Sequence, residues 1–193
     1  MTGLWSMKAL PAGVLAGVKT YDHGMPSAVD DELVDIVDDS DRVIAVVSRR
    51  EMRAGRLRHR AVYIAVQGSD GRLLVHQRSF DKDVRPGAWD IAVGGVVGSG
   101  ESYDAAAVRE MAEEIGVLAI TPTPIGGGTF GDESFELIGR CYHVVHDGPF
   151  TFADGEVIRA KWVDRGELDA LLATEEVMHD SVALLLGHLD VSE

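Results

Sequence analysis

The chain has 193 residues, a length that allows one sizeable hydrophobic core and is slightly long for a single compact domain. Hydrophobic residues make up 46% and charged residues 26%, which excludes wholesale disorder, and the lack of any apolar run of about eighteen residues excludes a membrane-spanning helix. The formal net charge of −14 predicts repulsion from nucleic-acid backbones and anionic lipid, so we expect neither a nucleic-acid polymer nor a membrane as a partner.

Residues 1–29 contain several turn-forming prolines and glycines and show no sustained hydrophobic periodicity. We expect them to be an N-terminal extension that is partly ordered at best, ahead of one domain at residues 30–193. Cys141 is the single cysteine, which excludes an internal disulfide and fits a reducing cytoplasm. It lies in a strand-like apolar run, where we expect a buried and inert thiol.

From Leu33 onward the pattern predicts strands and helices in irregular alternation. We expect strands at 33–38 and 42–47, then a short helix that begins with a Ser48–Glu51 capping box and is closed by Gly55. The next strands are predicted at 61–67 and 72–77, joined by a turn of sequence GSDG. This order predicts a mixed sheet with helices on both faces.

The second half of the chain continues the same alternation. A helix is predicted from an N-cap at Ser102 to Ile115, with Gly116 as its stop. Strands are predicted at 119–130, 136–145 and 156–164, with the glycines at 126–128 marking a bend or turn. Two further helices, at 166–172 and about 181–189, close the chain.

The helix after Ser102 carries an unusual set of acidic residues near its C-terminal end. At about 100° per residue, one face is apolar, and three glutamates fall within roughly a 100° arc opposite it; the two sets are Val108, Met111, Ala112, Ile115 and Glu110, Glu113, Glu114. Like charges four residues apart cost about 0.2–0.5 kcal/mol per pair, and carboxylates in a last helical turn oppose the helix dipole.

A solvated acidic face is the ordinary interpretation of such a run of charge. That interpretation gives no role to four other residues at fixed spacing from the carboxylates, namely Gly95, Glu101, Arg109 and Gly116. Mg²⁺ prefers oxygen ligands and takes a few carboxylates together with waters and substrate phosphates. A bound cation converts the repulsion between the glutamates into attraction, so the pattern predicts a metal site.

The stretch from Gly95 to Val117 resembles the Nudix box, G-x5-E-x7-R-E-U-x-E-E-x-G-U, in which U is a bulky aliphatic residue. Every specified position is filled, by Gly95, Glu101, Arg109, Glu110, Met111, Glu113, Glu114, Gly116 and Val117. The resemblance implies an α/β (α+β) fold, a Nudix-type α/β/α sandwich with a mixed curved sheet. It also implies a loop–helix–loop that holds a divalent metal against a diphosphate.

The resemblance assigns roles to individual residues. Glu110, Glu113 and Glu114 would be metal ligands, and either Glu113 or Glu114 would also polarise the attacking water. Arg109 and Glu101 would pair to brace the helix, with Gly95 and Gly116 as structural positions of the box. The implied cofactor is Mg²⁺, with Mn²⁺ as an alternative.

The segment before the box resembles the Nudix branch that contains isopentenyl-diphosphate isomerase. Gly94 and Val96 stand where the isomerase has its cysteine and histidine, so the isomerase chemistry is missing while the hydrolase box is complete. We therefore expect a Mg²⁺-dependent hydrolase that cleaves a diphosphate bond in a nucleoside diphosphate-linked or related small molecule. The alternatives are an isomerase-like enzyme and a non-catalytic nucleotide-binding module, and a homodimer is left open.

Five further side chains are candidates for the site. In the isomerase-like branch an R-x3-K pair grips the diphosphate, and Arg78 and Lys82 match that spacing. A further metal ligand from outside the box helix is expected at Glu156, with Glu136 as the alternative. His59 is left open between a metal ligand and a structural histidine.

Trp89 precedes the box. It could stack on a substrate base, but its apolar surroundings favour a place in the core beneath the box helix.

Overall fold

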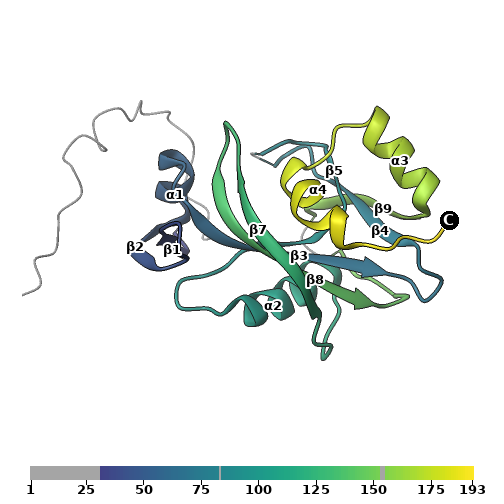
Figure 1. The fold of residues 1–193 in the computed structure, drawn as a ribbon, viewed down its shortest axis with the longest axis horizontal. Coiled ribbons are helices and arrows are strands. Elements are labelled where there is room, and N and C mark those ends of the chain that lie inside the picture. Colours follow the sequence, from purple (N-terminus) through teal and green to yellow (C-terminus); the bar gives the residue numbers. More distant parts are fainter. Residues whose placement is uncertain (1–30, 83, 153–154) are drawn as a thin grey trace, which may run out of the picture.

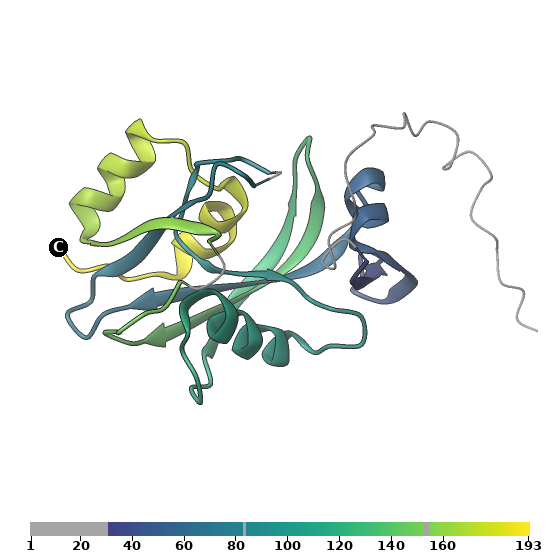
Figure 2. The same ribbon diagram turned by 180° about the vertical axis from the view of Figure 1, so that it is seen from behind.

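The computed structural model describes residues 31–82, 84–152 and 155–193 (Figure 1). The extension predicted at residues 1–29 lies outside these described residues. One mixed sheet is covered by helix α2 on one face and by helices α3 and α4 on the other, as the two opposite views show (Figures 1 and 2). In the described part of the chain, no helix has the length and apolar character needed to cross a membrane.

The sheet is built around one central strand, β3. The strands are β1 Leu33–Val37, β2 Val43–Ser48, β3 His59–Gln67, β4 Leu73–Arg78, β5 Trp89–Asp90, β6 Val93–Val96, β7 Thr123–Gly131, β8 Glu136–Val145 and β9 Val157–Val163. β3 pairs in parallel with β8 and antiparallel with β6, while β4 pairs antiparallel with β9. The predicted mixed sheet is therefore confirmed.

The helices are short except for α2. Their bounds are α1 Arg49–Gly55, α2 Tyr103–Ile115, α3 Arg165–Thr174 and α4 His179–Leu185, followed by a 3-10 turn at Leu186–His188. α1 begins with the expected capping box, in which Ser48 and Glu51 exchange hydrogen bonds.

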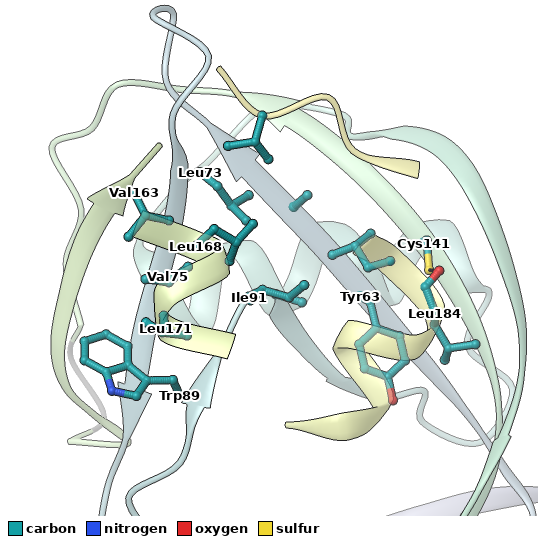
Figure 3. Close-up of a cluster of buried hydrophobic side chains, with 14 of the residues drawn as sticks. Tyr63, Leu73, Val75, Trp89, Ile91, Cys141, Val163, Leu168, Leu171 and Leu184 are labelled. Atoms are coloured by element: carbon teal, nitrogen blue, oxygen red, sulfur yellow. Dashed lines mark hydrogen bonds between the residues drawn. The ribbon is translucent and has the colours of Figure 1, made fainter. Parts of the chain in front are cut away.

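The alternation of side chains along β3 supplies both cores. Val62 and Ile64 point into a cluster that also contains Met111 and Ile115 of α2. Tyr63, one residue along, joins a second cluster with side chains of β4, α3 and α4 (Figure 3). Because both faces of β3 are covered, its sequence is a nearly continuous apolar run rather than an alternating one.

The predicted turn at 68–71 joins β3 to β4, and the two strands share the pair Gln67 and Leu73, while β4 pairs along its length with β9. Two other local predictions were wrong in detail. Gly55 is the last residue of α1, but the left-handed residue that closes the helix is Arg56 (φ 50°) and not Gly55. The helix predicted at about 181–189 is divided into α4 and the 3-10 turn.

The strand predicted at 119–130 begins at Thr123, and its glycines do not form a turn. They continue β7 through a bulge between Pro124 and Gly126. A β-carbon on Gly127 would come within 2.4 Å of the Gly139 carbonyl oxygen, so the close approach of β7 to β8 explains the glycine.

Candidate active site

The limits of α2 are those predicted from the sequence. The Ser102 hydroxyl oxygen accepts a hydrogen bond from the Ala105 N–H at 3.2 Å, which caps the start of the helix. Gly116 ends it in the left-handed conformation (φ 70°), with its N–H bonded to the Met111 carbonyl.

The buried face of α2 differs from the predicted one. Val108 is 37% exposed, whereas Glu110 is only 7% exposed. The buried side follows an i, i+3, i+4 spacing through Tyr103, Ala106, Ala107, Glu110, Met111 and Ile115. Glu114, four residues after Glu110, continues that stripe. The glutamates therefore do not stand together opposite the core, because Glu110 and Glu114 face the sheet and only Glu113 is exposed.

Strand β6 makes room for these carboxylates because it presents glycine at the point of contact. A β-carbon on Gly95 would come within 2.6 Å of Glu110 Oε1. The Gly94 N–H donates a hydrogen bond to Glu114 Oε2 at 3.2 Å. A β-carbon on Gly94 would come within 2.0 Å of the Val62 carbonyl oxygen of β3. The close pairing of β6 with β3 therefore also requires glycine at position 94. The acidic side chains thus lie against bare backbone.

Arg109 binds both the loop before α2 and the carboxylates on it. Its guanidinium donates two parallel hydrogen bonds to Glu101, at 3.0 and 2.9 Å, so the expected ion pair is present. Nη1 donates to Glu110 at 2.8 Å and to Glu113 at 3.0 Å, and Nη2 donates to the Val96 carbonyl. One side chain therefore connects β6, the loop and the helix.

The buried carboxylates hold their protons more tightly than free ones. Burial raises the pKa of Glu110, although the neighbouring Arg109 opposes the rise. Burial also raises the pKa of Glu114 to well above its ordinary value, and the charges of Glu110 and Asp90 add to the rise. Among the described residues no lysine or arginine forms an ion pair with Glu114. The ionised forms of Glu110 and Glu114 are therefore disfavoured at this position in the absence of a further positive charge.

These donors fit a hard divalent cation, since two buried carboxylates that repel each other offer oxygen ligands. Within residues 31–82, 84–152 and 155–193, however, three or more His, Cys, Asp or Glu side chains do not gather in an arrangement that could hold a metal ion. Arg109 accounts for part of this, because it holds Glu113 and Glu110. The metal assignments of Glu110, Glu113 and Glu114 remain predictions.

The other predicted site residues lie at the end of β4. Arg78 is the last residue of that strand, and Lys82 follows in the loop after it. Lys82 forms an ion pair with Glu156, and the Ser79 N–H donates to the Glu156 carbonyl at 2.7 Å. The structure thus joins a predicted phosphate-binding lysine to the predicted extra metal ligand. The positive charge of Lys82 also acts on Glu114, which places this loop near α2.

The remaining candidates are placed elsewhere. Glu136 forms an ion pair with Arg58 at 3.1 Å. His59 is buried, its Nδ1 lies 3.0 Å from the Leu57 carbonyl, and burial lowers its pKa. Trp89 is in the core as expected, but it packs on the α3 side of the sheet and not beneath α2 (Figure 3).

A buried polar cluster, not predicted from the sequence, lies across the sheet from α2. The Tyr63 hydroxyl donates to Asp180 Oδ2 at 2.7 Å, and Tyr63 lies opposite Gly94 in the strand register. Asp180 Oδ1 is buried and has no hydrogen-bond partner among the described residues. Burial raises the pKa of Asp90 and of Asp180. A charged residue inside the apolar run WDIAV was the available signal for Asp90.

Known proteins of one family are similar to this chain in sequence and in fold. The NUDIX domain matches residues 57–185. An uncharacterized Nudix hydrolase of Yersinia pestis is 41% identical over 160 residues, which cover 83% of this chain and 86% of that protein. The uncharacterized Nudix hydrolase YfcD of Escherichia coli K12 is 38% identical over 154 residues, or 80% of this chain and 84% of YfcD.

Among solved structures, DR0079 of Deinococcus radiodurans matches with a TM-score of 0.66 and 28% identity, covering 77% of this chain and 94% of that one. Nudix hydrolases cleave pyrophosphate bonds and generally use divalent metal cations. The family match, the relatives and the α/β/α arrangement agree, and the chain belongs to the Nudix family as a pyrophosphohydrolase.

Proposed function

We propose that the protein is a Mg²⁺-dependent hydrolase that cleaves the diphosphate bond of a nucleoside diphosphate-linked or related small molecule. The observation that carries the proposal is the pair of acidic side chains of α2 that lie against the glycines of β6, the buried Glu110 and the half-buried Glu114. Burying two neighbouring carboxylates is unfavourable in the metal-free protein, and a bound cation reverses the sign of that interaction.

The chain's own residues have separate tasks in this proposal. Glu110 and Glu114 hold the cation, Glu113 or Glu114 accepts a proton from the attacking water, and Arg109 with Glu101 keeps α2 in place. A bound divalent cation supplies neutralisation of phosphate charge and activation of water. Arg78 offers a guanidinium fork and Lys82 a point charge to the diphosphate.

Glu156 is proposed as the ligand from outside α2. Its ion pair with Lys82 supports a position beside the diphosphate. Binding of a cation to Glu156 would release Lys82 toward the phosphate oxygens, which links the two candidate roles.

The test is a screen of the purified protein with Mg²⁺ against nucleotide sugars, dinucleotides, nucleoside di- and triphosphates and coenzyme A, with chromatographic separation of the phosphate-containing products as the readout. On the best substrate, Glu114→Gln keeps the shape and removes one charge, so kcat should fall about 100-fold or more. Glu133→Gln, on an exposed loop, is the matched control and should leave kcat unchanged. Unchanged turnover in both Glu110→Gln and Glu114→Gln would contradict the metal assignment.

A further inference from the structure

A pocket of about 530 Å³ lies between β9 and α3. Its walls include Trp89, Arg159 and Lys161 on the strand side and Thr174 on the helix side. It contains none of the glutamates of α2, and α3 covers the sheet face opposite to α2 (Figure 2). Its volume falls within the range of small-molecule sites.

The indole of Trp89, which lines this pocket, carries a hydrogen-bond donor that no described residue uses. The residue is 4% exposed, and its Nε1 is buried with no hydrogen-bond partner in the described part of the chain. Figure 3 shows the nitrogen on the edge of the ring that points away from Val163 and Leu168. Buried donors without an acceptor are rare in native structures, and an ordered water or a bound ion is one of the ways in which such a group is satisfied.

Two cations stand over the same indole. Arg159 Cζ lies 4.8 Å and Lys161 Nζ 5.2 Å from the ring centroid. Arg159 and Lys161 are two residues apart in β9, so their side chains lie on the same face of the sheet as that of Val163. Val163 packs on the α3 side of the sheet, and the two cations therefore lie on that side. Arg159 is held by a hydrogen bond from its Nε to Gln77 Oε1 at 2.7 Å, which leaves the two terminal nitrogens of the guanidinium for other acceptors.

The two cations of the pocket are not neutralised by ion pairs, since neither Arg159 nor Lys161 pairs with a carboxylate of the described residues. Two glutamates also line the pocket, Glu167 of α3 and Glu175 at the C-cap of that helix, so the formal charges of the lining balance. Glu167 is engaged in the helix cap, where it accepts the Asp164 N–H at 3.1 Å. The unpaired cations both lie on the β9 side of the pocket, and that side is where an anion would bind.

We propose that this pocket is a second anion site, which binds a small phosphate anion such as inorganic phosphate or pyrophosphate. The Arg159 guanidinium supplies a planar fork, Lys161 a point charge, and the Trp89 N–H a directed neutral donor, a set that suits the several oxygens of a phosphate group. Binding here requires no metal ion, so it is independent of the hydrolytic site at α2.

The test follows the indole N–H resonance of Trp89 by ¹H–¹⁵N NMR while pyrophosphate is added in EDTA at constant ionic strength. EDTA removes the cations on which the site at α2 depends. The Trp89 resonance should shift saturably, because its proton gains an acceptor. In the Arg159→Gln, Lys161→Gln double variant the affinity should fall about tenfold or more.

The matched control is the Arg42→Gln, Arg72→Gln double variant, which makes the same change in net charge at two exposed arginines outside the pocket. Its affinity for pyrophosphate should equal that of the wild type, and so should that of Glu114→Gln. Three results would overturn the proposal: no shift at millimolar pyrophosphate, an equal loss of affinity in the control, or an equal shift with citrate at the same ionic strength.

Discussion

Gly95 lies beside the Glu110 carboxylate, and Gly94 lies against the backbone of β3. A β-carbon at Gly95 would meet only the far end of a flexible side chain, 2.6 Å from Glu110 Oε1. One at Gly94 would meet the Val62 carbonyl oxygen at 2.0 Å, and the φ of Gly94 (154°) is one that other residues rarely adopt. Gly95 therefore leaves space for the Glu110 carboxylate of the candidate site, whereas Gly94 allows the close pairing of β6 with β3.

We predict that Gly95→Ala folds but displaces the Glu110 carboxylate, with kcat reduced about 100-fold and stability reduced by about 1 kcal/mol. Gly94→Ala should instead cost about 3 kcal/mol or more, because the strand itself must move. Urea unfolding and turnover on the screened substrate separate the two effects. An equal loss of stability in both variants would contradict the assignment of Gly95 to the site and of Gly94 to the pairing of the strands.

Asp180 yields a prediction on pH, because its folded and unfolded pKa values differ. Burial raises the folded pKa above 3.8, the nearby Asp90 adds to the rise, and the Tyr63 hydrogen bond opposes it. A raised carboxyl pKa contributes stability that is fully present below the unfolded pKa and is lost as the pH rises through the folded pKa.

Asp180→Asn removes this titration while keeping an oxygen that can accept from Tyr63. Relative to wild type, the variant should therefore gain stability as the pH rises from the unfolded pKa through the higher folded pKa, because only the wild type loses stability over that range. Urea denaturation at several pH values checks this, with Asp147→Asn on an exposed loop as a control. Parallel stability curves for wild type and Asp180→Asn would contradict it.

At the scale of elements, α2 is attached to β6 and to the loop before it through one guanidinium. Arg109 donates to Glu101, Glu110, Glu113 and the Val96 carbonyl. The hydrogen bonds to Glu101 are the largest cause of the raised pKa of Arg109. A lysine keeps the charge but cannot form the parallel pair of bonds to Glu101 together with the other contacts.

We expect Arg109→Lys to lower the free energy of unfolding by about 1–3 kcal/mol, because hydrogen bonds to charged groups are lost and Glu110 stays buried. Activity should fall as well, since the helix that carries the carboxylates loses its brace. Arg165→Lys in α3, whose ion pair with Asp169 is exposed, is the control and should stay within about 0.5 kcal/mol of wild type. If Arg109→Lys changed the free energy of unfolding as little as Arg165→Lys does, the proposal that Arg109 holds α2 in place would be contradicted.

At the scale of the whole molecule, the sheet separates the two proposed sites. The face under α2 carries the carboxylates of Glu110 and Glu114, whose pKa values are raised by burial, and the face under α3 carries the Trp89 pocket with its two cations. The first face should bind cations and the second anions, and each can be measured without the other.

Binding of Mg²⁺ at α2 should therefore stabilise the whole fold. At about 100 times its Kd, a ligand of the folded state adds about 2.7 kcal/mol, which corresponds to a rise in Tm of about 5–10 °C for a chain of this length. The Glu110→Gln, Glu114→Gln double variant should lose that rise in calorimetry. A Glu133→Gln, Glu193→Gln variant makes the same charge change at exposed positions and should keep it. An equal rise in both variants would show that Mg²⁺ binds elsewhere.

Several features of the protein were determined by the sequence alone, because local chemistry decides them. Ser102 and Gly116 limit α2, since a side-chain cap and a left-handed glycine act on their nearest backbone groups. β8 has the predicted bounds, and the nine positions of the box identify the family. These signals need no knowledge of what packs against them.

Only the tertiary structure decided which side of α2 is buried. The helical spacing allowed either Val108 and Ala112 or Glu110 and Glu114 to share a face with Met111 and Ile115, and hydrophobicity favoured the first choice. In the structure Glu110 and Glu114 face the sheet. Gly95 of β6 leaves space for the Glu110 carboxylate, and the Gly94 N–H donates a hydrogen bond to Glu114.

The same holds for contacts between distant segments. The parallel pairing of β3 with β8, the meeting of Lys82 with Glu156 and the cations of β9 over Trp89 join residues far apart in the chain. No local pattern encodes such contacts. They follow from how the strands assemble in the sheet, and this assembly is what places the two candidate sites on opposite faces.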